Sequence, residues 1–121
     1  MIIAIGIAAA AGSVCRYLLD LAVQHHTRSE LPLGTLVVNT TGSLALGFVA
    51  GLVIHHGLDD TPRHVIGTGF IGAFTTFSTL SYETVQLIEH GARRDALVTT
   101  ILSLLLGLVA AGAGLALAGA L

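Results

Sequence analysis

The stretch LGTLVVNTTGSLALGFVAGLVI, residues 33–54, contains no aspartate, glutamate, lysine or arginine. A helix needs about 20 predominantly apolar residues to cross the hydrocarbon core of a bilayer, and this stretch is long enough. Lipid offers no hydrogen-bond partners, so a helix that satisfies its own backbone groups is the natural structure. Residues 33–54 therefore predict a transmembrane helix.

Three further apolar blocks of sufficient length lie on either side, at residues 2–23, 65–88 and 96–120. None shows the short alternating segments of a transmembrane β-barrel. The sequence thus predicts an all-α membrane protein that crosses the bilayer four times, with residues 1–121 forming one four-helix domain.

The overall composition supports this prediction. Of the 121 residues, 54% are hydrophobic and only 10% are charged, whereas soluble domains carry about 25% charge. The net charge of −2 gives no basic face for nucleic acid, so no such partner is expected. The N-terminus lacks the basic region of a signal peptide, and we interpret it as the first membrane helix.

An even number of crossings puts both termini on one side of the membrane. The opposite side carries Arg28, Arg93 and Arg94 against Arg63, which weakly favours placing that opposite side in the cytoplasm. A bias this weak permits insertion in both orientations, and hence antiparallel dimers.

Two ladders of small residues at four-residue spacing allow helix backbones to approach closely. They could pack within one chain or between two copies, and the sequence leaves both alternatives open. The ladders are Ser43, Gly47 and Gly51 in one block and Ala110, Gly114 and Ala118 in the other.

The third block contains an unusual run of hydroxyl side chains after two glycines, in the stretch GFIGAFTTFSTL of residues 69–80. Serine and threonine compete for backbone hydrogen bonds, and glycine weakens a helix. We expect a break near Thr75–Thr79, where freed carbonyl groups suit a hard cation such as Na⁺ or Ca²⁺.

Polar side chains within the membrane are functional candidates by default. Arg16 either pairs with Asp20, one turn away, or attracts an anion at a vestibule. Asn39 either donates hydrogen bonds to a ligand or joins helices. The stripe Thr99, Ser103 and Gly107 faces a pore or merely packs. The abundance of donors, with Glu83 as an embedded carboxylate, favours a small, hard anion.

The histidines cluster in the polar connectors, including the pairs His25-His26 and His55-His56. Solvated side chains are favoured over a metal site, because no carboxylate or cysteine recurs at ligand spacing. No nucleophile–base pair stands out either, so the chain is not expected to be an enzyme.

Three motifs resemble one family, the CrcB/Fluc fluoride channels. They are GSVCRY at residues 12–17, PLGTLVVN at 32–39 with Gly42 and Ser43, and GFIG at 69–72 followed by TTFSTL at 75–80 and Glu83. The resemblance covers the first three blocks, while the fourth matches mainly in hydropathy. It implies a dual-topology antiparallel homodimer with two pores that export fluoride passively across the plasma membrane of a microbe.

The resemblance also implies roles for individual residues. A structural Na⁺, which is not transported, would be held by main-chain oxygens of Gly72 and Thr75. Arg16 and Glu83 would set the charge of the vestibule. Leu80 departs from the family, which usually has an aromatic residue there. The fluoride pore would be lined by Thr35, Asn39, Phe77, Ser78, Thr79, Leu80 and Ser103.

Two rival functions fit a chain of this size. A small multidrug transporter also has four helices, but proton-coupled cation export needs an embedded carboxylate in the first helix, where only Asp20 occurs, near its end. Such a cavity also favours tryptophan, which is absent. A non-catalytic assembly subunit is the third reading, and it leaves the hydroxyl-rich third block unexplained.

Overall fold

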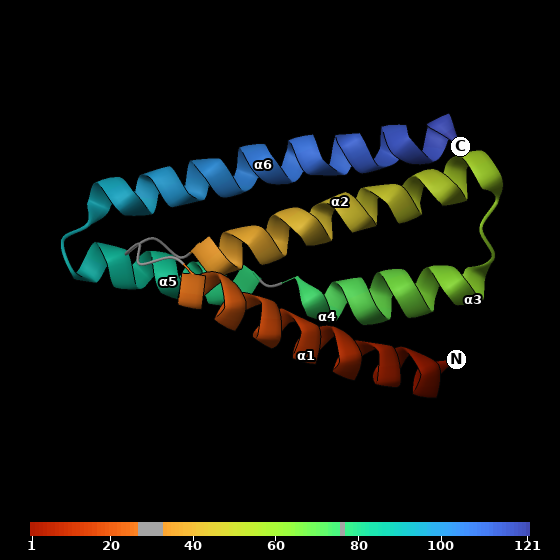
Figure 1. Cartoon of the computed structure of the whole chain (residues 1–121), viewed down its shortest axis with the longest axis horizontal. Coiled ribbons are helices and arrows are strands. Elements are labelled where there is room, and N and C mark those ends of the chain that lie inside the picture. Colours follow the sequence, from red (N-terminus) through yellow and green to blue (C-terminus); the bar gives the residue numbers. More distant parts are fainter. Residues whose placement is uncertain (27–32, 76) are drawn as a thin grey trace.

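The computed structural model describes residues 1–26, 33–75 and 77–121, with Phe77 and Ser78 described by their backbone alone. Three helices, α1 (Ile2–His26), α2 (Leu33–His56) and α6 (Arg93–Ala120), are long and apolar enough to cross a membrane. No strand occurs in the described ranges. The prediction of an all-helical chain is confirmed for these residues (Figure 1).

The third apolar block is built from shorter helical pieces. They are α3 (Asp60–Pro62), the π-helix η1 (Arg63–Ile71), α4 (Gly72–Phe74) and α5 (Phe77–Glu89). At the end of η1 the Gly72 N–H bonds to the carbonyl of Gly67, five residues back. Thr75 follows α4 with extended backbone angles, φ −80° and ψ 153°. Glycine and β-branched residues are weak helix formers and lower the preference for a regular α-helix here.

The helices extend further than hydropathy predicts. The predicted ends at residues 23 and 54 become His26 and His56, and the last helix begins at Arg93 rather than at residue 96. Four histidines expected in connectors are therefore the last residues of α1 and α2. The reason is that hydropathy marks the length immersed in lipid, whereas backbone hydrogen bonding continues into the polar interface.

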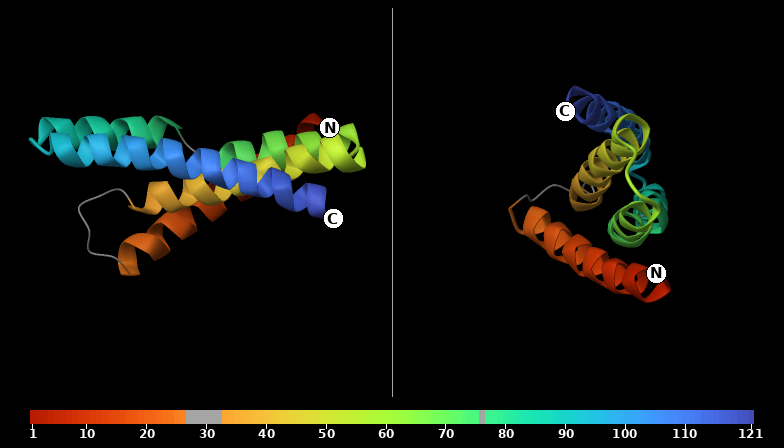
Figure 2. Two further views of the ribbon diagram at one scale, coloured as in Figure 1. Left: turned by 90° about the horizontal axis from the view of Figure 1, so that it is seen from above. Right: turned by 90° about the vertical axis from the view of Figure 1, so that its right-hand side faces the viewer.

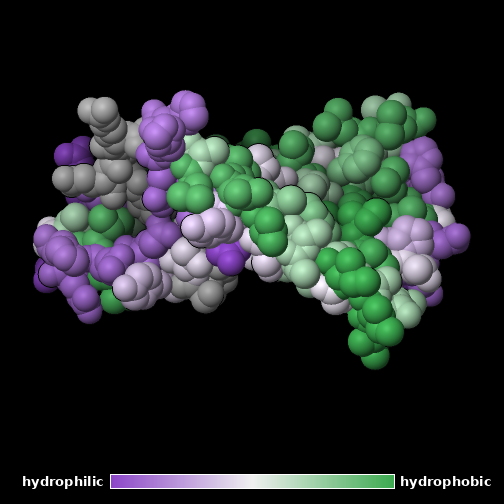
Figure 3. Space-filling model, turned by 60° about the horizontal axis from the view of Figure 1, so that its bottom comes forward, coloured by the Kyte–Doolittle hydropathy of each residue, from purple (hydrophilic) through white to green (hydrophobic). Residues whose placement is uncertain are grey.

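The two termini lie at the same end of the molecule, as an even number of crossings requires (Figure 1). The connection from α2 to α3 lies at that end too, and the turn from α5 to α6 lies at the other. Hydrophilic residues gather mainly at the two ends, with a largely hydrophobic band between them (Figure 3). This distribution fits a bundle whose middle is immersed in lipid.

The contact between α2 and α6 is the most extensive between two helices in the described part of the chain. A Cβ on Gly47 would overlap the carbonyl of Ala111, and one on Gly114 would overlap the carbonyl of Leu44. A Cβ on Gly51 would lie 2.5 Å from that of Ala118. The two ladders of small residues therefore pack on one another within one chain, which decides the alternative that the sequence left open.

On its other side α2 contacts α1, and α1 also packs on the third segment (Figure 2). Glycine again sets the spacing, because a Cβ on Gly12 would overlap the carbonyl of Phe70. A Cβ on Gly69 would lie 2.9 Å from the carbonyl oxygen of Ile5. With few large side chains buried, most leucines of α6 point outward, as expected for a helix in lipid.

Candidate functional site

The polar residues of α2 and α6 face one another because the two helices run parallel and in register. Gly107 faces the hydroxyl of Ser43, and one turn further along Ala111 faces Gly47. If this register is extended four residues back along both helices, Ser103 is level with Asn39. One further turn back, Thr99 lies level with Thr35. This arrangement unites polar positions that are far apart in the sequence.

Two threonines in this region are almost fully buried. Thr35 on α2 is 2% exposed and Thr99 on α6 is 3% exposed. The Thr35 hydroxyl donates a hydrogen bond of 2.6 Å to Oε1 of Glu83 on α5. Three helices, α2, α5 and α6, thus meet at one polar site, and all three are in mutual contact.

The α6 hydroxyls differ from that of Thr35 in lacking a partner. Oγ1 of Thr99 and Oγ of Ser103 are both buried and form no hydrogen bond with any described residue. A buried polar group without a partner costs about 1–3 kcal/mol. Two such groups on one helix face, one turn apart, suggest that a ligand or water completes their hydrogen bonding.

The other predicted pore residues of α2 and α5 differ in how much the structure describes of them. Asn39 on α2 and Thr79 on α5 are half-buried, and each already interacts with another group. Leu80 is half-buried on α5, and its carbonyl accepts a 2.8 Å bond from Oγ1 of Thr84. The predictions for Phe77 and Ser78 concern side chains outside the described part of the chain.

The two predicted vestibule residues occupy different surroundings. Glu83 is tied to Thr35 inside the polar site. Arg16 is half-buried on α1, and no ion pair joins it to Asp20 among the described residues. Asp20 instead accepts a 3.3 Å bond from Gln24 and lies against Gly34, in the first turn of α2. Of the alternatives considered for Arg16, pairing with Asp20 is therefore not what the structure has.

Gly72 and Thr75, the predicted cation-binding residues, flank the end of α4. Gly72 is exposed and Thr75 is half-buried. The Thr75 N–H and hydroxyl both bond to the carbonyl of Ile71, at 3.0 and 3.1 Å. The Thr75 methyl group packs against Gly42 of α2, where a Cβ would overlap it. Phe74 stacks on Phe70, with ring centroids 6.1 Å apart, and so has a packing role.

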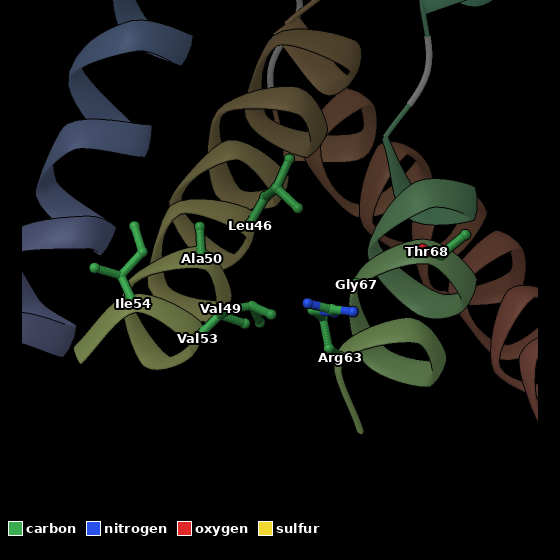
Figure 4. Close-up of a pocket in the computed structure, with 8 residues that line it drawn as sticks. All are labelled: Leu46, Val49, Ala50, Val53, Ile54, Arg63, Gly67 and Thr68. Carbon is green, nitrogen blue, oxygen red and sulfur yellow. The ribbon is translucent and has the colours of Figure 1, made fainter. Parts of the chain in front are cut away.

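A groove of about 500 Å³ lies between α2 and η1. Figure 4 shows the Arg63 side chain reaching from η1 toward α2 across this groove. Arg63 also forms a 2.6 Å ion pair with Asp60. Thr68 of the groove and Gly72, one turn further on, are both exposed, so the groove shares a face with Gly72. The remaining lining is mostly apolar and comprises Leu46, Val49, Ala50, Val53, Ile54 and Gly67.

Comparison with known proteins agrees with the resemblance seen in the sequence. The model of the family described as "CrcB-like protein, Camphor Resistance (CrcB)" matches residues 3–115. A fluoride-specific ion channel FluC 1 from Leifsonia xyli subsp. xyli is 44% identical over 119 residues, which cover 98% of this chain and 87% of that protein. A fluoride-specific ion channel FluC from Rhizobium meliloti is 39% identical, with 96% and 94% covered. A FluC 1 from Rubrobacter xylanophilus is 46% identical, with 88% and 84% covered.

Proposed function

We propose that this chain, which belongs to the CrcB-like protein family, is a fluoride-selective ion channel that lowers internal fluoride by passive export. Its relatives are named fluoride-specific ion channels, and the similarity extends over nearly the whole length of both chains. These names are those of channels rather than of enzymes, in agreement with the absence of enzymatic function predicted from the sequence. The observation that carries the proposal is the pair of buried hydroxyls on α6 that lack a partner, Thr99 and Ser103.

Fluoride is a small anion that holds its water tightly, so a pore must replace that water with hydrogen-bond donors. The hydroxyls of Thr99 and Ser103 have hydrogens that no described residue accepts. The Asn39 amide on α2 also carries N–H groups, and Asn39 already interacts with another group. In surroundings of low dielectric constant such donors act more strongly than in water. Chloride is larger and more easily dehydrated, and it gains less from this close set of donors.

Thr35 has a more conditional role in this pathway. Its hydroxyl hydrogen is directed at Glu83, 2.6 Å away, and is therefore occupied. Thr35 can serve an anion only when that bond opens. Thr99, not among the predicted pore residues, takes a place beside Ser103 because both hydroxyls share one face of α6. Its signal in the sequence was the four-residue spacing of the stripe.

The proposal includes an antiparallel homodimer. Four helices in one chain enclose little space, and few large side chains are buried. The face that carries Thr68, Gly72 and the groove beside α2 is exposed in the single chain. A second copy inserted in the opposite orientation would cover this face through an isologous contact about a two-fold axis. The dimer would contain two equivalent pathways.

A structural Na⁺ at the meeting point of the two copies completes the proposal. The last four carbonyl groups of a helix have no donors within that helix, and Thr75 departs from helical geometry directly after α4. Main-chain oxygens of this kind are the ligands that hard cations prefer. The exposed Gly72 and Thr75 of each copy would supply them, and the ion would offset the repulsion between converging carbonyl groups.

The membrane spans support a site of action within a membrane. Three helices of spanning length and an ion-channel family make this an integral membrane protein, and we assign it to the plasma membrane of a microbe. Efflux of fluoride from liposomes that contain the purified protein tests the proposed function directly.

A further inference from the structure

A second groove, of about 470 Å³, lies between α5 and α6 at the end of the molecule opposite the termini. It is lined by Thr84 and Ile88 of α5 and by Arg93, Ala96, Leu97 and Thr100 of α6. From this groove we propose a binding site for an anionic phospholipid, with one acyl chain in the groove and the phosphate at Arg93. The proposal concerns the protein's surroundings and does not rest on the fluoride pathway.

The lining is apolar despite its two threonines. The Thr84 hydroxyl donates to the Leu80 carbonyl at 2.8 Å, and the Thr100 hydroxyl donates to the Ala96 carbonyl at 2.9 Å. Both hydroxyl hydrogens are therefore engaged by the helix that carries them. The groove can offer a ligand methyl and methylene contacts from Ile88 and Leu97, which are 48% and 61% exposed. Because an acyl chain in the bilayer is already out of water, these contacts favour it by van der Waals packing.

The charge lies at one end of the groove. Arg93 is exposed, and its guanidinium forms no hydrogen bond or ion pair with any other described residue. It begins α6, whose apolar run starts only at Ala96, so its guanidinium lies at the level of the lipid headgroups. Thr100 is seven residues further along, about 10 Å deeper at the rise of an α-helix.

The guanidinium presents a planar set of donors that fits phosphate oxygens. A soluble anion would use Arg93 but not the apolar lining, whereas a neutral acyl chain would use the lining but not Arg93. An anionic phospholipid uses both. We therefore commit to phosphatidylglycerol-type lipid as the occupant.

The test is native mass spectrometry of the purified full-length protein with added dioleoyl phosphatidylglycerol or dioleoyl phosphatidylcholine. We expect the wild type to retain phosphatidylglycerol about fivefold better, because one basic residue near the membrane surface contributes about 1 kcal/mol. R93Q should abolish this preference. R94Q removes the same charge from the neighbouring residue, which does not line the groove, and should keep it.

A second pair of variants tests the groove itself. T100F should fill it and reduce retention of both lipids severalfold, while I101F, at an exposed position outside the lining, should not. Four results would overturn the proposal. Equal loss in R93Q and R94Q would mean general charge attraction, and full competition by inorganic phosphate would mean a soluble-anion site. A T100F variant that loses dimer but retains lipid would assign the groove to a contact between copies. Equal retention of the two lipids by the wild type would overturn it without any variant.

Discussion

Thr35 of α2 donates its hydroxyl hydrogen to Glu83 of α5 across 2.6 Å, and this bond joins two helices that otherwise touch at few points. The bond occupies the hydroxyl of one buried threonine and leaves the other, Thr99, unsatisfied. The polar site thus contains one hydroxyl that donates to a carboxylate and others that have no hydrogen-bond partner among the described residues. That difference between two threonines at one level of the bundle leads to the first prediction.

Removal of the Thr99 hydroxyl should impair transport without harming the fold. Thr99→Val keeps the shape and removes an unpaired buried hydroxyl, so the free energy of unfolding should stay the same or rise by about 1 kcal/mol. Fluoride flux should fall about tenfold or more, since a hydrogen bond to a charged group contributes about 1.5–3 kcal/mol. Flux from liposomes and thermal unfolding in detergent measure the two effects.

The matched control for Thr99 is Thr41→Val on α2. Thr41 is exposed, and its hydroxyl bonds to the Val37 carbonyl of its own helix at 2.8 Å. This variant should keep normal flux. Normal flux in Thr99→Val would mean that Thr99 has no role in transport. Unfolding of Thr99→Val, but not of Thr41→Val, would mean that Thr99 is a structural residue.

The glycines of α6 should differ sharply in their tolerance of a methyl group. Gly114→Ala places a Cβ against the Leu44 carbonyl and within 2.6 Å of the Phe48 nitrogen, so we expect a loss of about 1–3 kcal/mol from overpacking. Gly112→Ala meets nothing within 4 Å and should be neutral or stabilising by up to about 1 kcal/mol through helix propensity. Thermal unfolding in detergent measures both. Equal effects at the two positions would contradict the packing of α2 on α6.

The proposed Na⁺ site should depend on the ion more than on the Thr75 side chain. Thr75→Val keeps the methyl group that packs on Gly42 and loses only a hydroxyl bonded to Ile71. We expect it to retain most activity in Na⁺. Replacement of Na⁺ by N-methylglucamine should lower the activity or the dimer fraction of the wild type. Fluoride flux that is constant across a wide Na⁺ titration would contradict the proposed Na⁺ site.

Dual topology can be tested by labelling single cysteines in the connectors after Cys15 is replaced. The arginine bias of three against one is too weak to fix one orientation. Each connector should therefore react from both sides of intact cells in similar amounts. Labelling of residues 24–32 from one side only would favour a parallel assembly.

The sequence predicts the membrane helices well because their signal is local. The charge-free run of residues 33–54 lies within α2, and the four-residue spacing of Ser43 and Gly47 gives the side of α2 that meets α6. Helix ends were predicted less well, since His25 and His26 remain helical beyond the apolar run. Hydropathy reports where lipid ends and not where hydrogen bonding ends.

The tertiary features of the site required the structure. Nothing in the sequence pairs Thr35 with Glu83, because that bond depends on how α5 is placed after Thr75. The π-helical geometry of η1 is also absent from any hydropathy pattern. The stripe of Thr99 and Ser103 was visible in the sequence, but only the structure shows that both hydroxyls are buried without a partner among the described residues.

The central claim is that this chain conducts fluoride and rejects chloride, and ion efflux from proteoliposomes measures it most directly. With ion-selective electrodes, wild-type liposomes should release fluoride rapidly and chloride at the rate of protein-free liposomes. Asn39→Asp keeps the size of the side chain but replaces its N–H donors with a negative charge, so it should abolish fluoride release while the dimer stays intact. Chloride release comparable to that of fluoride, or normal fluoride release by Asn39→Asp, would contradict the account.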